Sequence, residues 1–282
     1  MKMFASFIFY SIFLLFLGRN LSFLPQIDLQ TKEQNAQEVK RKAQQFVASQ
    51  KGMFSVYYKD LTTGREFGIN ENRVLTGASL NKLMIVSYLY HLAAEDKIDL
   101  DEKVVIQKED VQDYGTGTLR YNGVGETLSL RSLAQLALEK SDNTAGYVLG
   151  IKLNMENIEK YAKNLGLFSS SMKHNKTTAK DMGTILDLLY NGKITNKAYT
   201  QEFLDFLKDT DFENRLPRFF EEDVVVYHKI GDAINMVHDV GIIDAERKPF
   251  ILAVLTTEIV DEEEAKRAVG ELAKIIYEAR SK

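Results

Sequence analysis

The sequence predicts a mixed α+β protein in which both ends of the chain build one antiparallel sheet and the middle is mostly helical. Two observations support this prediction. Alternating apolar and polar residues occur at 54–69, and strand-type runs rich in β-branched residues return at 224–257. Between them, apolar residues recur with helical spacing. We therefore expect residues 31–76 and 222–282 to form a sheet lobe and residues 77–221 to form a helical lobe.

The first residues are typical of a targeting segment. Lys2 is followed at residues 3–17 by an apolar run of about 15 residues, shorter than the ~20 that a membrane-spanning helix needs. We expect residues 1–20 to be a signal peptide or an N-terminal membrane anchor, and residues 21–30 to be a linker. The protein would then act outside the cytoplasm, as a secreted, periplasmic or membrane-anchored domain.

A docking helix and a strand pair open the folded part. The residues from Thr31 form a capping-box pattern, and an apolar stripe behind it predicts a helix that packs by one face. Alternation at 54–58 predicts a strand, the turn residues 62–64 follow, and residues 65–69 can return as a second strand. The apolar stripe consists of Val39, Ala43, Phe46 and Val47.

The middle of the chain is dominated by helical patterns. Residues 79–94 are apolar nearly all round, which is typical of a buried helix. Residues 129–149 form a second helical region that is interrupted at 141–143. A helix-start pattern at 178–181 then predicts a further helix.

The C-terminal part returns to strands. Three runs rich in β-branched residues, 224–230, 236–243 and 250–257, are separated by short turn-like segments, which predicts antiparallel pairing. Residues 261–264 are acidic and open a last helix that ends in basic residues, in agreement with the helix dipole. Both terminal helices can cover one face of the sheet.

The composition excludes several classes of protein. The net charge of −4 argues against nucleic acid as the main partner, since phosphate binding needs a basic field. Without cysteine, the chain has no disulfides, thiolate metal sites or cysteine nucleophile. The four histidines lack metal-type spacing, so we expect no metal and no cofactor. As a separate expectation, the protein is a monomer. These histidines are His91, His174, His228 and His238.

The first motif that carries chemistry is Ser79-Leu80-Asn81-Lys82. A serine at the start of a buried helix and a lysine three positions later lie on one helix face. Serine is a weak nucleophile that needs a base within reach, and a lysine with a lowered pKa can be that base. Taken alone, the pattern also fits a capping serine followed by a lysine that reaches out to solvent.

Two further motifs follow. Ser141-Asp142-Asn143 interrupts an apolar helical region, where a polar triplet needs partners, although it also fits a helix cap. His228-Lys229-Ile230-Gly231 ends a strand, and glycine there permits close approach of a substrate to the backbone. An edge-strand lysine with a turn glycine is the alternative for this last motif.

Together, in this order, the three motifs resemble the S-x-x-K, S-D-N and K-T-G set of class A β-lactamases and penicillin-binding proteins. The likeness runs from about Phe54 to the last helix. It implies a five-stranded antiparallel sheet flanked by helices, plus an all-helical subdomain. By motif position, Ser79 would be the acylated nucleophile and Lys82 its base or proton relay. Ser141 would pass a proton toward the leaving nitrogen.

The resemblance also implies substrate-binding roles. Asn143 would hold the substrate's side-chain amide, and Lys229 would attract its carboxylate. Gly231 would allow the close approach, and the backbone N–H groups of Ser79 and Asp232 would form the oxyanion hole.

The sequence departs from the family pattern at two places. Ile230 replaces a hydroxyl residue that normally helps to bind the substrate carboxylate, and His228 or His238 are the candidates to compensate. Residues 160–178 contain no carboxylate, whereas class A β-lactamases carry a glutamate on this connection for deacylation.

We therefore expect a serine hydrolase that is acylated at Ser79, opens β-lactam rings and deacylates slowly. A D-alanyl-D-alanine carboxypeptidase or transpeptidase acting on peptidoglycan stems is one alternative, and a catalytically impaired module that binds β-lactams or peptidoglycan is another. The expected partners are β-lactam antibiotics or D-Ala-D-Ala peptides.

Overall fold

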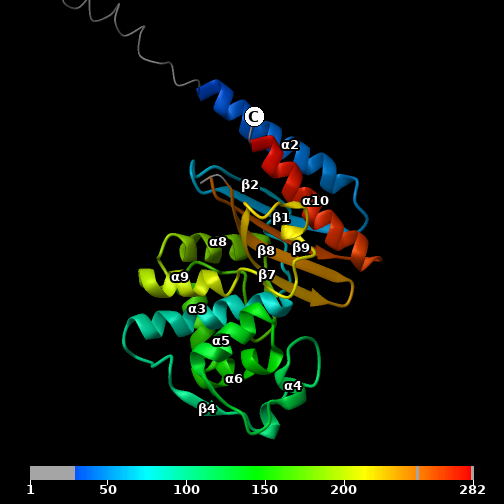
Figure 1. Ribbon diagram of the computed structural model, residues 1–282. Coiled ribbons are helices and arrows are strands. Elements are labelled where there is room, and N and C mark those ends of the chain that lie inside the picture. The colour runs from blue at the N-terminus through cyan, green and yellow to red at the C-terminus, as the bar shows by residue number, and fades with distance from the viewer. Residues whose placement is uncertain (1–28, 246–247, 281–282) are drawn as a thin grey trace, which may run out of the picture.

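The computed structural model describes residues 29–245 and 248–280, and its centre is a five-stranded antiparallel sheet (Figure 1). The strand order is β2-β1-β9-β8-β7, so the first two strands extend the sheet begun by the last three. All five predicted strands are confirmed. They are β1 (Met53–Asp60), β2 (Glu66–Ile69), β7 (Val225–Ala233), β8 (Met236–Asp244) and β9 (Phe250–Thr257).

The two terminal helices cover the same face of this sheet. Helix α2 (Leu29–Ala48) and helix α10 (Glu262–Arg280) lie side by side on it, as predicted (Figure 1). Val39 and Ala43 pack there in one apolar core with residues of α10 and with the alternate strand residues that face them. Helix α2 begins before Thr31, so Thr31 is not the cap. Leu29 and Gln30 are good helix formers and extend the helix.

Helices of the middle segment cover the opposite face. Helix α8 (Ala179–Tyr190) packs on β1, β8 and β9, and helix α3 (Asn81–Ala94) is buried behind it. The predicted cap at Thr178 is confirmed, since its side chain accepts a hydrogen bond from the backbone N–H of Asp181 at 3.0 Å. Tyr57 and other odd-numbered residues of β1 and β9 point into this second core.

The helical lobe is less uniform than expected. One small two-stranded sheet lies within residues 77–221, and a second pairs residues of this region with Leu75–Thr76, so the region is not all-helical. Residues with high strand propensity, such as Val104, Val105 and Thr127, account for one of them. The two sheets pair β3 (Leu75–Thr76) with β6 (Lys176–Thr177) and β4 (Lys103–Val105) with β5 (Thr127–Ser129). The remaining helices are α4 (Leu119–Asn122), α5 (Leu130–Glu139), α6 (Asn143–Leu153), α7 (Met155–Asn164) and α9 (Lys197–Asp205).

The predicted targeting segment and most of the predicted linker lie outside the described residues. Within residues 29–245 and 248–280, no helix combines the length and the apolarity that crossing a membrane requires.

A buried histidine ties the loop before β7 to the sheet. His228 Nδ1 lies 2.9 Å from Asp239 Oδ1, and its Nε2 lies 3.2 Å from Glu213 and 3.1 Å from Thr210. Burial lowers the pKa of His228, but the two carboxylates outweigh burial and raise it to about 9. The charged imidazolium is therefore the form that the folded protein stabilises.

This network predicts a pH-dependent contribution to stability. Because the pKa of His228 is raised on folding, its contribution is complete below its unfolded value of about 6.5 and is lost as the pH rises through 9. We expect the free energy of unfolding of wild type to exceed that of His228→Gln by up to ~3 kcal/mol below pH 6.5, and the difference to shrink by pH 9. Denaturant titrations at each pH measure it. The exposed His174→Gln is the control, and a difference that grows with pH contradicts the prediction.

Candidate active site

Ser79 lies in a tight turn that aims it into a cavity. The turn is the short 3-10 helix η2 (Ala78–Leu80), between strand β3 and helix α3, so Ser79 precedes the α-helix. Ala78 takes a positive φ of 48°, an uncommon conformation for a residue with a Cβ, and strain of this kind is often concentrated at active sites. Leu80 anchors the turn because it is fully buried.

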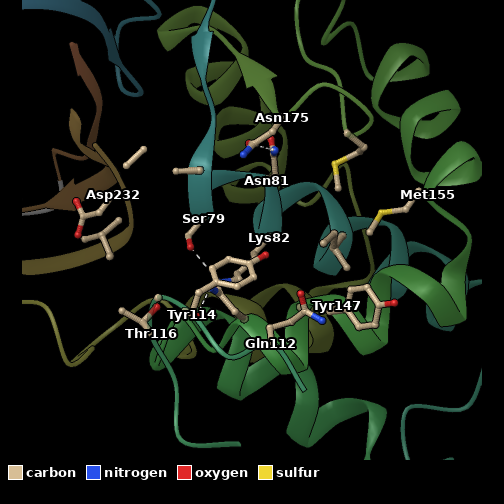
Figure 2. Close-up of a pocket in the computed structure, with 18 residues that line it drawn as sticks. Ser79, Asn81, Lys82, Gln112, Tyr114, Thr116, Tyr147, Met155, Asn175 and Asp232 are labelled. Atoms are coloured by element: carbon tan, nitrogen blue, oxygen red, sulfur yellow. Dashed lines mark hydrogen bonds between the residues drawn. The ribbon is translucent and has the colours of Figure 1, made fainter. Parts of the chain in front are cut away.

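Lys82 joins the first two motifs, as Figure 2 shows for its bond to Ser79. Its Nζ lies 2.9 Å from Ser79 Oγ, 2.6 Å from the Ser141 carbonyl oxygen and 2.7 Å from Asn143 Oδ1. Burial lowers the pKa of Lys82 to about 7, against the opposing charge of Asp142. A large fraction of Lys82 is therefore a neutral amine near pH 7, and a neutral amine can accept a proton.

The second motif interrupts the helical region because Asp142 caps helix α6. Ser141 has a positive φ of 52°, and Asp142 accepts the backbone N–H of Ala145 at 3.0 Å. Asn143 then starts the helix, with its side-chain amide donating to the Tyr114 carbonyl at 2.9 Å and its oxygen facing Lys82. The triplet is therefore both a helix cap and a part of the site, because Ser141 and Asn143 lie beside Lys82.

The third motif reaches the site from strand β7. Lys229 Nζ donates to Ser141 Oγ at 2.8 Å and to the Ile230 carbonyl at 3.1 Å. Burial, together with the neighbouring Lys82, holds the pKa of Lys229 well below its usual value. Gly231 allows a close approach, but to the turn: a Cβ there would lie 3.1 Å from the Gly77 carbonyl oxygen.

These residues surround one cavity of about 400 Å³. Asp232 lies on its strand side and Met155 on the other (Figure 2). Ser141, Lys229 and Gly231 do not line it and lie behind its wall, where Ser141 is fully buried. The lining residues are Ala78, Ser79, Asn81, Lys82, Ile85, Gln112, Tyr114, Gly115, Thr116, Asn143, Gly146, Tyr147, Met155, Met172, Asn175, Ile230, Asp232 and Ala233.

Several cavity residues were not predicted from the sequence. Thr116 donates to the Ser141 carbonyl at 2.8 Å, and Asn81 bonds Asn175 at 2.6 Å across the cavity edge. Arg215 is fully buried and donates to Asp232 at 2.6 Å. The glycine-rich run at 113–118 was the available signal for the loop that carries Thr116.

The histidines do not compensate for Ile230 within this cavity. His228 is held in its buried ion network, and His238 bonds the Thr76 carbonyl and the Thr256 N–H. Neither lines the cavity, whereas Ile230 does. Among the described residues, no group of three or more His, Cys, Asp or Glu side chains is placed to hold a metal ion.

The model of the beta-lactamase enzyme family matches residues 38–279 of the chain. The chain belongs to this family. It is therefore a serine hydrolase of the beta-lactamase family, and the expected sheet architecture is confirmed.

The relatives of this beta-lactamase family member are distant. Beta-lactamase SME-1 of Serratia marcescens is 23% identical over 249 residues, 81% of this chain and 84% of that protein. The structure of PBP-A has a TM-score of 0.81 at 21% identity, covering 86% of this chain and 96% of that one. A beta-lactamase structure from Sphaerobacter thermophilus has a TM-score of 0.80 at 22% identity, with the same coverage. At these identities, the solved structures support the fold alone.

Proposed function

We propose that this protein is acylated at Ser79 by β-lactams, opens the β-lactam ring and releases the product slowly. The observation that carries the proposal is the position of Lys82, a buried amine with a lowered pKa, 2.9 Å from the Ser79 hydroxyl. A nucleophile and a base in hydrogen-bond contact beside a cavity are the arrangement that acyl transfer needs.

Acylation begins when neutral Lys82 takes the proton of Ser79 Oγ and the oxygen attacks the lactam carbonyl carbon. The backbone N–H groups of Ser79 and Asp232 stabilise the negative charge that develops on the carbonyl oxygen. The C–N bond then breaks, and the ring nitrogen receives a proton from Ser141 Oγ. Ser141 regains its proton from Lys82, whose Nζ lies 3.4 Å away.

The remaining motif residues hold this arrangement in place. Asn143 binds the substrate's side-chain amide through the carboxamide that also contacts Lys82. Lys229 keeps Ser141 oriented through its 2.8 Å hydrogen bond, and it attracts a substrate carboxylate only through the wall behind which it is buried. Gly231 keeps the strand close to the turn that carries Ser79.

The lining of the cavity supports slow deacylation. The connection between α7 and α8 contributes Met172 and Asn175, neither of which can take a proton from water. Glu159 on α7 is turned to this connection, where it accepts the Lys173 N–H at 3.3 Å, and it does not line the cavity. Among the described residues, the one carboxylate that lines the cavity is Asp232, and it is paired with Arg215.

A fluorescent penicillin tests both parts of the proposal. We expect a covalent adduct that survives denaturation, is absent in Ser79→Ala and is kept in Ser169→Ala, a substitution at an exposed serine. Intact-mass spectrometry should show the adduct decaying more slowly than roughly 1 s⁻¹, the low end of ordinary turnover. The absence of any adduct overturns the function, and fast sustained hydrolysis of a chromogenic cephalosporin overturns slow deacylation.

The same acyl-serine chemistry serves a D-alanyl-D-alanine peptidase, and the lack of a loop carboxylate favours this second function. The similar PBP-A fold has been solved as an acyl-enzyme complex with penicillin G, although in a mutant. Adduct lifetime separates the two functions, because a peptidase is trapped by penicillin while it still turns over peptide. Both substrates are met outside the cytoplasm, and we assign the protein, as a monomer, to that compartment.

A further inference from the structure

The strand side of the cavity carries an unusual set of groups. Three residues at the end of β7 line it: Ile230, Asp232 and Ala233, here called the strand wall. Ile230 is apolar and Ala233 offers no charge. Asp232 therefore supplies the only side-chain charge of the strand wall, and that charge is negative.

The cations nearest to the strand wall are buried behind it. Lys229 and Arg215 are each 1% exposed, and neither lines the cavity. Lys229 Nζ donates hydrogen bonds to Ser141 Oγ and to the Ile230 carbonyl. Arg215 donates to the His238 carbonyl at 2.8 Å and to Asp232 at 2.6 Å. Because the Arg215 guanidinium already donates to Asp232, it is not free to bind the carboxylate of an incoming substrate.

The rest of the cavity does not replace these cations. Among the described residues that line it, the cationic side chain is Lys82, whose Nζ is already bonded to Ser79, Ser141 and Asn143 and whose charge is reduced near pH 7 because its pKa is lowered to about 7. An anionic group placed against the strand wall would lose its water, meet an apolar side chain and face a like charge. Each of these effects disfavours it.

We propose that Asp232 is a specificity residue that makes this site prefer acyl donors with an uncharged leaving group over donors that end in a free carboxylate. The inference rests on the proposed acyl-serine chemistry at Ser79. The favoured leaving groups are a carboxamide or a peptide that continues beyond the scissile bond, because their N–H groups can donate to Asp232. The Asp232 side chain is 44% exposed, and its Oδ2 accepts from Arg215, which leaves further lone pairs toward the cavity.

Two matched thioesters test the proposal: phenylacetylglycyl-thioglycolate, which is anionic, and its thioglycolamide, which is neutral. Attack by Ser79 Oγ breaks the C–S bond of either one, forms the same phenylacetylglycyl ester on the serine and releases a thiol that a chromogenic reagent detects. We expect wild type to have a kcat/KM at least about tenfold higher for the amide, the size of one modest charge interaction.

The variants then locate the cause. Asp232→Asn keeps an oxygen for Arg215 while removing the charge, and we expect it to lower the amide-to-carboxylate ratio about tenfold, mainly by raising the rate with the anion. Asp223→Asn, in the exposed turn before β7, should leave the ratio unchanged. Asp232→Ser, with its folding checked by thermal unfolding, is the second variant and should lower the ratio as well.

The outcomes separate this proposal from the proposed function. If wild type forms no Ser79 adduct with either thioester or with penicillin, the acyl-serine function itself fails, and this inference with it. If both thioesters acylate Ser79 but the ratio is near one in wild type, or is unchanged in folded Asp232→Asn and Asp232→Ser, the function stands and Asp232 does not set specificity.

Discussion

Replacing Lys82 with methionine is expected to lower the rate of Ser79 acylation about a thousandfold, the usual scale for loss of a general base. Methionine fills a similar volume, so the buried site stays packed. The Ser79 hydroxyl would lose the amine 2.9 Å away that we propose as its proton acceptor. Stopped-flow measurement of adduct formation with a fluorescent penicillin gives the rate.

The pH profile identifies the state of Lys82 that acts. The proposed base is the neutral amine, and its pKa is lowered to about 7. We therefore expect the acylation rate of wild type to rise as the pH increases through 7 and then to level off. Lys82→Arg, which stays charged, should be as slow as Lys82→Met, and Lys152→Met on the exposed side of α6 should match wild type. A rate that falls as the pH rises through 7 would contradict the assignment of Lys82 as base.

The second large effect is expected at Asp142, where Asp142→Ala should lower the free energy of unfolding by about 3 kcal/mol. This buried carboxylate accepts three backbone N–H groups, from Thr118 at 2.7 Å, Leu119 at 2.9 Å and Ala145 at 3.0 Å. Alanine would leave all three donors without an acceptor. Urea unfolding followed by circular dichroism measures the change.

The same substitution should also slow acylation, because Asp142 joins helix α6 to the loop that carries Tyr114 and Thr116. Asp113→Ala is the matched control: it removes an exposed aspartate from that loop and should change stability by less than about 0.5 kcal/mol. A loss at Asp142 no larger than in this control would show that the three hydrogen bonds contribute little.

The sequence allowed the sheet and the motif geometry to be predicted because local patterns determine them. The strand segments alternate or are rich in β-branched residues, and the buried helix is apolar all round. The three-residue spacing brings Ser79, in the 3-10 turn, beside Lys82, in α3, although the two residues do not share one α-helix. Helix α2 started before Thr31 because capping preference is weak beside the helix propensity of the residues that precede it.

Other parts of the site depend on contacts between distant segments, which no local pattern contains. Arg215 reaches Asp232 only because the loop before β7 folds back beneath the strand, where His228 holds it. No local pattern indicates that Lys229 lies behind the cavity wall and not in the cavity, because its buried amine bonds Ser141, which is far away in the chain.

The pairing of α2 with α10 bears on how large molecules reach the cavity. Both helices lie on the sheet face opposite α3 and the turn with Ser79, so the chain enters the sheet on the side remote from Ser79 (Figure 1). A protein or solid support attached ahead of α2 would therefore leave the cavity open. A bulky acyl donor could then approach Ser79 without meeting the attachment.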